Sequence, residues 1–327
     1  MQSAEIAPRI HRIACMFDET RVIYCHLLLG RSKSLLIDTG MSYTPERDIL
    51  PYMASVEFDP ATLDYVLITH ADTDHQCGND VIRDAAPKAQ FMANNLDRAM
   101  IESPEALVRL RQAHLLADHA IGPDAQNQRD TINTCRSNIP MDVGIEGGET
   151  IRLSPDWHVQ LIHTPGHSRG HTAVYDPVSK TLIAAESALF SSIWDKDDQP
   201  ALPPTYYFVD SYLGTLERLR GMDIQTFSPA HWPVQSGEDV KAFLDESSAF
   251  CLHTEDVLLR TILAGTQPLT LAALMAALKP ELGHWPDAVD NMMAYPLLGN
   301  LRRLESRGAI QAARNSDGCI VWTGAQG

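Results

Sequence analysis

The sequence predicts a layered protein of helices and strands, followed by a smaller and mostly helical carboxyl-terminal region. Over about residues 1–237, short apolar runs that end in turns alternate with helical patterns, an alternation typical of helices packed on a sheet. From about residue 238 the helical pattern dominates. The 327 residues, 44% of them hydrophobic, with a mean hydropathy of -0.16, suffice for one large core and a smaller appended unit.

The amino-terminal elements are indicated by apolar runs bounded by turns. Residues 22–30 and 34–40 predict two strands joined by a tight connection. Helical spacing follows over residues 46–56. The continuous apolar run 65–69 predicts a buried strand, and this strand delivers His70 at its end.

Residues 96–150 have a different character. Ser103 followed by Pro104 is a typical helix start, because serine caps the first turn and proline suits the first helical position. This helix is expected to reach about Ala120, and a polar stretch follows it. We interpret the region as an insertion that caps one face of the core; an ordinary surface excursion is the alternative.

Strands and helices then resume their alternation. A helix is expected over residues 211–220, ending at Gly221. The last strand of this part leads directly into His231. The predicted strands cover residues 159–163, 172–175, 181–185 and 226–228.

The carboxyl-terminal region shows a helix, helix, hairpin order. Residues 269–278 and 291–307 are amphipathic, and residues 310–313 and 319–322 predict a short hairpin. This is a winged-helix pattern, which often binds DNA, although a fold does not fix a function. Residues 241–327 hold seven Lys and Arg against nine Asp and Glu. That balance favours a packing or dimerisation module over a DNA reader.

Composition excludes several classes of partner. The net charge of -16 repels polyanions, so we expect no nucleic-acid partner. No run of about 18 apolar residues predicts a membrane span, and the amino terminus lacks the apolar core of a secretory signal. We therefore expect a cytoplasmic protein that acts on a small-molecule substrate. A homodimer is left open. The six cysteines form no C-x-x-C pair, which argues against a disulfide scaffold or a zinc ribbon.

One stretch carries an unusual density of ligand-type residues. "THADTDHQCGND" places His70, Asp72, Asp74 and His75 within six positions, directly after the predicted buried strand. Imidazole and carboxylate groups are ligands for zinc, iron and manganese. A polar loop before a capped helix is the ordinary alternative. The sequence therefore predicts a metal site at the end of this strand.

Further ligand-type residues recur at later strand ends. In "HTPGHSRGH", residues 163–171, the Pro-Gly turn aims His167 away from a strand. Glu186 and His231 each close an apolar strand, and Asp38 follows another. Five separate strand-end or loop positions thus present ligand-type residues, namely 38, 70–75, 167, 186 and 231.

Together these stretches resemble the metallo-β-lactamase-fold hydrolases. The resemblance covers about residues 8–236 and implies an α+β fold, an αββα sandwich, with metals at one edge. It implies a catalytic domain over residues 1–237, with the insertion at about 96–150, and a winged-helix-like extension over 238–327. The matching motifs are "LLIDTG" (35–40), "DYVLITHADTDH" (64–75), "HTPGHSRGH" (163–171), "LIAAES" (182–187) and "PAHW" (229–232).

The resemblance also implies a ligand set for two divalent metal ions. The first ion would take His70, Asp72 and His167, and the second Asp74, His75 and His231; Glu186 would bridge them and Asp38 would support a ligand. The family usually has histidine at position 72 and aspartate at position 186. Zinc is the first expectation, but the carboxylate of Asp72 shifts the preference toward iron or manganese. Two occupied sites are expected, with one weak or empty site as the alternative.

The function implied is a dinuclear metal-dependent hydrolase. A hydroxide shared by the metals would attack an ester, lactone or thioester carbonyl, and Asp74 would orient it as the catalytic residue. One alternative is a di-iron redox protein on the same fold, motivated by Asp72. The other is a non-catalytic regulator with a winged-helix tail.

Several neighbouring residues have ordinary interpretations. His163 and His171 are expected to support the turn around His167 rather than bind metal. Cys77 is interpreted as a small buried thiol, with a redox role as the alternative. The remaining candidates are expected on a partly exposed face or along the pocket; they are His114, Asp118 and His119, and, as pocket wall, Tyr206, Tyr207, Phe208 and Trp232.

Overall fold

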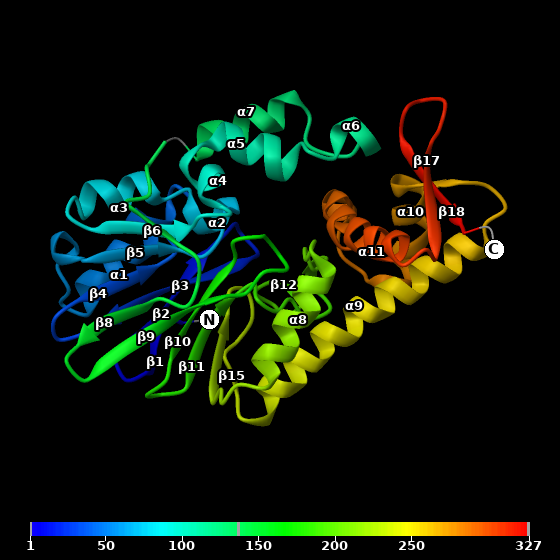
Figure 1. Ribbon diagram of the computed structural model, residues 1–327. Coiled ribbons are helices and arrows are strands. Elements are labelled where there is room, and N and C mark those ends of the chain that lie inside the picture. Colours follow the sequence, from blue (N-terminus) through cyan, green and yellow to red (C-terminus); the bar gives the residue numbers. More distant parts are fainter. Residues whose placement is uncertain (1, 136–137, 326–327) are drawn as a thin grey trace.

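The computed structural model describes residues 2–135 and 138–325. Two β-sheets lie face to face with helices on their outer sides, as Figure 1 shows. This confirms the predicted αββα sandwich. The first sheet has the order β1-β2-β3-β4-β5-β6-β7, with β1 (Ala4–Ala7), β2 (Ile10–Met16), β3 (Val22–Leu29), β4 (Ser34–Ile37), β5 (Tyr65–Ile68), β6 (Gln90–Asn94) and β7 (Val143–Ile145).

The second sheet runs mainly antiparallel and pairs β11 with β14 in parallel. Its order is β15-β14-β11-β10-β9-β8, with β8 (Thr150–Ser154), β9 (Trp157–His163), β10 (Thr172–Asp176), β11 (Thr181–Ala185), β14 (Thr226–Pro229) and β15 (Gln235–Ser236). A separate pair joins β12 (Ile193–Trp194) to β13 (Pro200–Leu202). Every strand predicted for the first 237 residues is present.

Continuous apolar strands explain the layered packing. All four residues of β4 and all five of β11 are buried, so both faces of each sheet are covered. Leu28 and Ile37 of the first sheet pack against Val159 and Ile183 of the second. This apolar layer holds the two sheets together and fixes which of their edges meet.

Several outer helices turn apolar residues toward the core, among them Ile49, Met53, Leu216 and Leu219. The helix predicted at 46–56 is a π-helical turn, η1 (Pro45–Ile49), that continues into α1 (Leu50–Ser55). The predicted helix over 211–220 is α8 (Val209–Arg220), which ends at Gly221 as expected. The other helices of this part are η2 (Pro60–Thr62), α2 (Thr73–Gln76), α3 (Asn79–Ala85) and α4 (Arg98–Glu102).

The insertion is more broken than its sequence predicts. Ser103 caps the helix start through Ala106 N at 3.2 Å, as expected. The single helix to Ala120 is nevertheless wrong, because the chain forms α5 (Pro104–Leu107), a π-helical turn η3 (Val108–Gln112) and α6 (Leu116–His119). The polar stretch that follows contains α7 (Ala125–Thr134). Its residues have no buried stripe, so hydrophobic periodicity could not reveal it.

A disulfide joins Cys77 to Cys135, which are 58 positions apart in the chain. Cys77 ends α2, the helix of the first ligand cluster, and Cys135 ends α7 in the insertion. The interpretation of Cys77 as an isolated buried thiol is therefore wrong. Cysteine spacing alone does not show which residues a fold brings within bonding distance.

The carboxyl-terminal region begins with one long helix, α9 (Glu238–Ala264). Next come β16 (Leu269–Thr270), α10 (Leu271–Leu282), η4 (Asp287–Met293) and α11 (Ala294–Ser306), and then the hairpin β17 (Ile310–Arg314) and β18 (Ile320–Gly324). The helix predicted from residue 269 starts later, because Leu269 and Thr270 pair with β18 and Thr270 then caps α10. The helix, helix, hairpin order is present, and its winged-helix interpretation stays a prediction.

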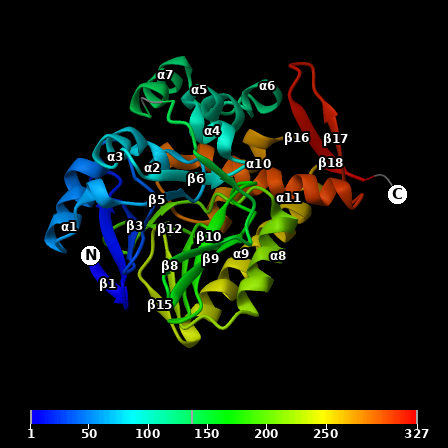
Figure 2. The ribbon, with the colours of Figure 1, turned by 60° about the vertical axis from the view of Figure 1, so that its left-hand side comes forward.

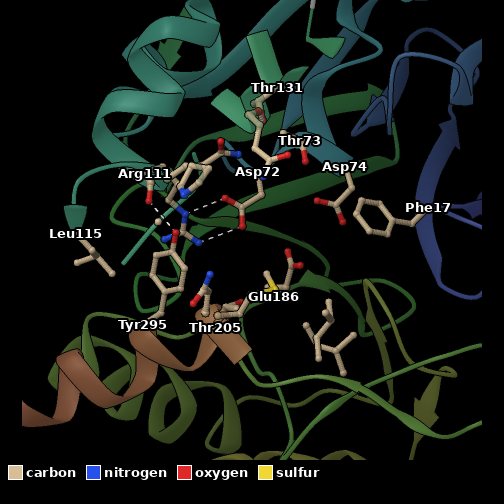
Figure 3. Close-up of a pocket in the computed structure, with 18 of the residues that line it drawn as sticks. Phe17, Asp72, Thr73, Asp74, Arg111, Leu115, Thr131, Glu186, Thr205 and Tyr295 are labelled. Carbon is tan, nitrogen blue, oxygen red and sulfur yellow. Dashed lines mark hydrogen bonds and ion pairs between the residues drawn. The ribbon is translucent and has the colours of Figure 1, made fainter. Parts of the chain in front are cut away.

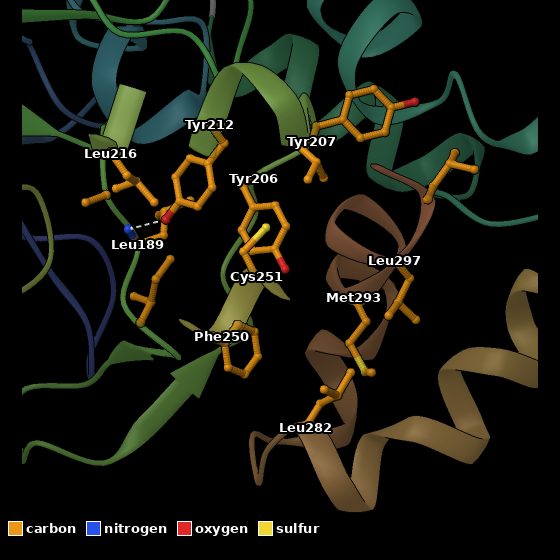
Figure 4. Packing of buried hydrophobic residues seen from close by; sticks show 14 of the residues in the cluster. Leu189, Tyr206, Tyr207, Tyr212, Leu216, Phe250, Cys251, Leu282, Met293 and Leu297 are labelled. Atoms are coloured by element: carbon orange, nitrogen blue, oxygen red, sulfur yellow. Dashed lines mark hydrogen bonds between the residues drawn. The ribbon is translucent and has the colours of Figure 1, made fainter. Parts of the chain in front are cut away.

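One hydrophobic cluster runs from the second sheet into the carboxyl-terminal region. It includes Tyr206, Tyr212 of α8, Cys251 of α9, Met293 at the end of η4 and Leu297 of α11, as Figure 4 shows. Tyr206 and Tyr212 stack with their ring centroids 4.8 Å apart. The sandwich and the carboxyl-terminal region therefore share a core.

The insertion also contacts the carboxyl-terminal hairpin, and Figure 2 shows α6 beside β17. Asp118 of α6 pairs with Arg314 of β17 at 2.6 Å. His119 stacks on Trp322 of β18, with ring centroids 5.6 Å apart. These two contacts join the insertion to the carboxyl-terminal hairpin. Within residues 2–135 and 138–325, no helix has both the length and the apolar content to cross a membrane.

Candidate metal centre

The first ligand cluster lies between β5 and α2, at the edge where the two sheets meet. His70 follows the buried strand, and Asp74 and His75 lie in the first turn of α2. Asp72 stands at the N-cap position, where an aspartate ordinarily accepts a bond from the helix. Its carboxylate instead pairs with Arg111.

The other predicted ligands come from ends of the second sheet. His167 follows a turn at Gly166, whose φ is +153°, and a Cβ there would lie 2.7 Å from the Tyr212 backbone. The turn therefore needs glycine. Glu186 directly follows β11, and His231 follows β14. The fold thus brings all seven predicted ligand residues to one place.

Hydrogen bonds behind the histidines fix which ring nitrogen faces the centre. His75 Nδ1 lies 2.7 Å from Asp38 Oδ2, a carboxylate that accepts its proton. The Thr69 hydroxyl donates to the same carboxylate at 2.9 Å and lies 3.1 Å from His70 Nδ1. Asp38 is therefore the support that the sequence predicted for it. Both rings carry their proton on Nδ1 and direct a bare Nε2 inward.

The same arrangement holds on the opposite side. His231 Nδ1 donates to the Val22 carbonyl at 2.9 Å, and His167 Nδ1 donates to the Thr205 carbonyl at 3.1 Å. A carbonyl can only accept, so these rings too expose an unprotonated Nε2. Four imidazole lone pairs consequently face one centre.

Glu186 lies in the middle of these lone pairs. Its Oε2 is 3.1 Å from both His70 Nε2 and His75 Nε2, and its Oε1 is 2.8 Å from His231 Nε2. Asp74 Oδ2 is 3.7 Å from His75 Nε2 and 3.6 Å from His231 Nε2. We call the group of Asp74, His75, Glu186 and His231 the second position; its ligand atoms lie within 4.8 Å of one another.

Three of these inward atoms are buried without a partner. Within the described chain, His70 Nε2, His75 Nε2 and Glu186 Oε2 form no hydrogen bond. Buried polar atoms are nearly always paired, and two acceptors facing each other repel. A cation among them would satisfy all three, so the residues fit a divalent metal ion.

The electrostatics indicate the same preference for a cation. Burial raises the pKa of Glu186, but His75 and His70 lower it more, and the net pKa lies well below the ordinary value. Burial lowers the pKa of His75, yet Glu186 and Asp38 raise it well above the ordinary value. The negative potential that attracts a proton to His75 attracts a metal ion equally well.

The remaining three ligands form a first position, made of His70, Asp72 and His167. Asp72 Oδ2 is 2.9 Å from His167 Nε2 and 3.8 Å from His70 Nε2. Arg111 of η3 binds this carboxylate with two bonds, Nε to Oδ1 at 2.8 Å and Nη2 to Oδ2 at 3.1 Å. Burial raises the pKa of Asp72, but Arg111 and His167 lower it well below the ordinary value.

Arg111 is the site residue that the sequence did not reveal. It lies in the insertion among other arginines, and only the π-helical turn of η3 buries it against the ligand cluster. The acidic residue in place of a histidine at position 72 was the available signal, since a buried carboxylate requires a cationic partner.

His163 and His171 have the supporting roles expected of them. His171 Nε2 accepts the backbone N–H of Glu186 at 3.0 Å, which uses its lone pair, and its Nδ1 lies 2.8 Å from Thr164 Oγ1. His163 Nε2 lies 2.7 Å from the Arg169 carbonyl. Neither ring directs a free lone pair at the centre.

A cavity of about 410 Å³ opens onto the centre. In Figure 3, Asp72 and Asp74 lie above Glu186, Arg111 faces Asp72, and Tyr295 lies next to Arg111. Its walls come from the connection between β2 and β3, the first ligand cluster, the insertion, residues 188–210 and the carboxyl-terminal region. The apolar wall residues are Phe17, Leu115, Ile121, Ile193, Leu202 and Met292.

The other pocket candidates lie elsewhere. Tyr206 and Trp232 are buried in the hydrophobic core, so their expected place in the pocket wall is wrong. His114 Nε2 lies 3.2 Å from the Tyr207 hydroxyl. Phe208 precedes α8 and packs beside the same core. With Asp118 and His119 bound to the hairpin, His114, Asp118 and His119 form no common site in the described chain.

Comparisons with known proteins agree with this geometry. The family model for the Metallo-beta-lactamase superfamily matches residues 19–231. A metallo-beta-lactamase family protein from Thermus thermophilus is similar, with a TM-score of 0.74 and 16% identity, over 98% of this chain and 100% of that one. A beta-lactamase domain protein from Burkholderia ambifaria has a TM-score of 0.76 and 15% identity, over 99% and 93% of the two chains.

The fold is also shared more distantly. A metal-soaked flavodiiron core from Synechocystis sp. PCC6803 has a TM-score of 0.51 and 17% identity, over 78% of this chain and 62% of that one. Identities this low establish the fold alone. The family assignment rests on the match to the family model, which spans every predicted ligand from His70 to His231. This chain belongs to the metallo-beta-lactamase superfamily.

Proposed function

We propose that this protein is a metal-dependent hydrolase that cleaves an activated carbonyl compound, namely an ester, a lactone or a thioester. The observation that supports the proposal is the convergence of four bare imidazole nitrogens and three carboxylates. Three of these inward-facing atoms, His70 Nε2, His75 Nε2 and Glu186 Oε2, are buried without a hydrogen-bond partner among the described residues. Membership of a largely hydrolytic superfamily supports the same reaction class.

Asp74, His75, Glu186 and His231 would hold the metal ion. A divalent cation there would supply a water activated near neutral pH, because such an ion lowers the pKa of water from 15.7 to about 7. We expect zinc, which imidazole and carboxylate ligands suit. Asp72 favours iron or manganese, but the Arg111 guanidinium offsets its charge. The resemblance implies a further ion, which His70, Asp72 and His167 of the first position would hold.

Asp74 is the residue we expect to move the proton. Its carboxylate lines the cavity, and burial raises its pKa above the ordinary value. A carboxylate shifted in this direction accepts a proton from the attacking water more readily and can pass it to the leaving group. Asp74 thus serves both to hold the metal and to transfer the proton.

The cavity indicates the size and character of the substrate. Its volume of about 410 Å³ suits a small molecule. Apolar atoms make up most of its wall surface, while the cationic side chains of Arg111 and Arg21 also reach it. We therefore propose a substrate with an apolar body whose carbonyl end faces the metal centre. Nucleic acid and membrane partners are not expected, and a homodimer stays a prediction.

The test is hydrolysis by purified, zinc-loaded protein of a panel of aryl esters, lactones and thioesters. We expect zinc-dependent turnover, lost on chelation and in the Asp74→Asn and His75→Ala variants. Asp84→Asn is the matched control, because Asp84 is an exposed aspartate on the neighbouring helix. Metal-loaded protein that hydrolyses none of the panel would refute the proposal. Bound iron with visible absorption would support the di-iron alternative, which the flavodiiron likeness keeps in view.

A further inference from the structure

Arg111 contacts two of the three ligands of the first position. Its Nη2 lies 3.1 Å from Asp72 Oδ2 and 3.0 Å from His167 Nε2. We propose that Arg111 is a built-in competitor for the first metal position, so that the protein binds one divalent ion tightly at the second position and another only weakly. The inference rests on the metal centre of the proposed function.

The lone pair of His167 carries the argument. His167 Nδ1 donates its proton to the Thr205 carbonyl at 3.1 Å, which leaves one lone pair on Nε2. That lone pair accepts from Arg111 Nη2. One lone pair cannot bind a metal ion and accept this bond at the same time. Metal binding at the first position therefore requires the guanidinium to leave His167.

The acceptors of the first position also need a cation, and Arg111 supplies it. Asp72 Oδ2 and the bare His167 Nε2 lie 2.9 Å apart, too close for two acceptors with nothing between them. The Arg111 Nη2 group donates to both. The guanidinium thus does electrostatically what a first metal ion would do.

Arg111 is held firmly in this place. Only 7% of its surface is exposed, and its Nη1 donates to the His167 carbonyl at 2.9 Å. The Tyr295 hydroxyl donates to the Arg111 carbonyl at 2.8 Å, and the Tyr295 ring lies 5.0 Å from the guanidinium carbon. A metal ion would have to displace a side chain fixed by α11 as well as by the ligand loop.

The second position differs in this respect. Its carboxylate Glu186 Oε2 and its ligand His75 Nε2 are buried without a partner in the described chain, whereas both oxygens of Asp72 are bonded to Arg111. In the first position only His70 Nε2 has no such partner among the described residues. The second position therefore offers unpaired ligand atoms to an ion, whereas Asp72 and His167 of the first position already bind Arg111.

The test is a titration of metal-free protein with Zn²⁺ against a competing chelator, followed by calorimetry. We expect wild-type protein to bind one ion tightly and a second much more weakly. In Arg111→Met, the second ion should bind about 10- to 100-fold more tightly, since the competing charge-assisted hydrogen bonds to Asp72 and His167 are gone and both residues are freed as ligands. Arg109→Met is the matched control, an exposed arginine two residues away, and should behave as wild type.

Two equally tight ions in wild-type protein would overturn the inference, and so would an Arg111→Met variant whose second ion binds no more tightly. If that variant does not fold, anomalous diffraction from wild-type crystals with one equivalent of Zn²⁺ decides the question. A single peak among Asp74, His75, Glu186 and His231 supports it, and an equal peak between His70 and His167 overturns it. These measurements record metal binding and not turnover. A failure of the hydrolase proposal, which is tested by turnover, can therefore be distinguished from a failure of this inference.

Discussion

Arg12 of β2 holds the turn that carries His231 of the opposite sheet. Its Nη2 donates to the Pro229 carbonyl at 3.0 Å and to the Trp232 carbonyl, so two carbonyls that bracket the histidine depend on one buried guanidinium. Arg12 also lies over the Tyr24 ring, 3.2 Å from its centroid. A residue remote from the cavity thus positions a ligand of the second position.

Arg12→Met should loosen this turn. It leaves two buried carbonyls unpaired, and we expect the free energy of unfolding to fall by about 1–3 kcal/mol for each carbonyl. Zinc affinity should fall as well, because His231 is no longer held in place. Thermal melting and zinc titration check both effects. Arg31→Met, which removes an exposed arginine paired with Asp156, should change neither the melting temperature nor the zinc affinity. Unchanged zinc affinity in Arg12→Met would show that the turn keeps its conformation without Arg12.

His75 and His171 should respond differently to substitution. His75→Ala removes an inward-facing lone pair and should abolish tight zinc binding. His171→Ala removes the acceptor of the Glu186 N–H and should lower the melting temperature while the number of bound ions stays the same. Metal content after gel filtration and thermal melting distinguish the two. Equal metal loss in both variants would make His171 a ligand.

The Cys77–Cys135 disulfide predicts a thiol count. Denatured protein should show four free thiols before reduction and six after it, because four of the six cysteines are free. Closing a loop of 58 positions stabilises the folded state by about 4 kcal/mol. Reduction or Cys135→Ser should lower the melting temperature, whereas Cys319→Ser, at a free cysteine, should not. Six reactive thiols in freshly isolated, denatured protein would contradict the bond.

The carboxyl-terminal region should not bind DNA. Leu297 and Leu301 of α11 are buried in the shared core, so the helix is covered by the rest of the protein. Arg303 forms ion pairs with Glu255 and with Asp210, the latter at 2.7 Å. These pairs neutralise the charge that a DNA phosphate would need. Fluorescence anisotropy with mixed-sequence duplexes at low salt should show no binding. Salt-sensitive, sequence-selective binding would refute this expectation.

Much of this molecule could be predicted from its sequence because the ligands follow buried strands. Strong apolar runs place β5, β11 and β14, and a layered fold then brings their ends to one edge. His70, Glu186 and His231 were found in this way. The supporting role of Asp38 came from the resemblance to the metallo-β-lactamase fold, and that of His171 from its place beside the turn of His167.

What could not be predicted depends on contacts between distant segments. Arg111 is one arginine among many until η3 turns it toward Asp72, and Cys135 finds Cys77 only in the folded chain. Helix α7 has no buried stripe, so its sequence shows only polar residues behind the cap at Asp124. Local periodicity carries no information on such pairings.

The shared core has a consequence for how this protein can be altered. Helix α9, 27 residues and about 40 Å long, packs Phe243 and Leu244 beside the second sheet and Leu258 and Ile262 beside the last helices. The same carboxyl-terminal region places Met292 and Tyr295 in the cavity wall. Exchanging this region for that of a relative would change substrate preference and folding together. Recombination between relatives would therefore have to exchange the 188–210 segment and the carboxyl-terminal region together, because Leu189 and Tyr206 of that segment lie in the same core.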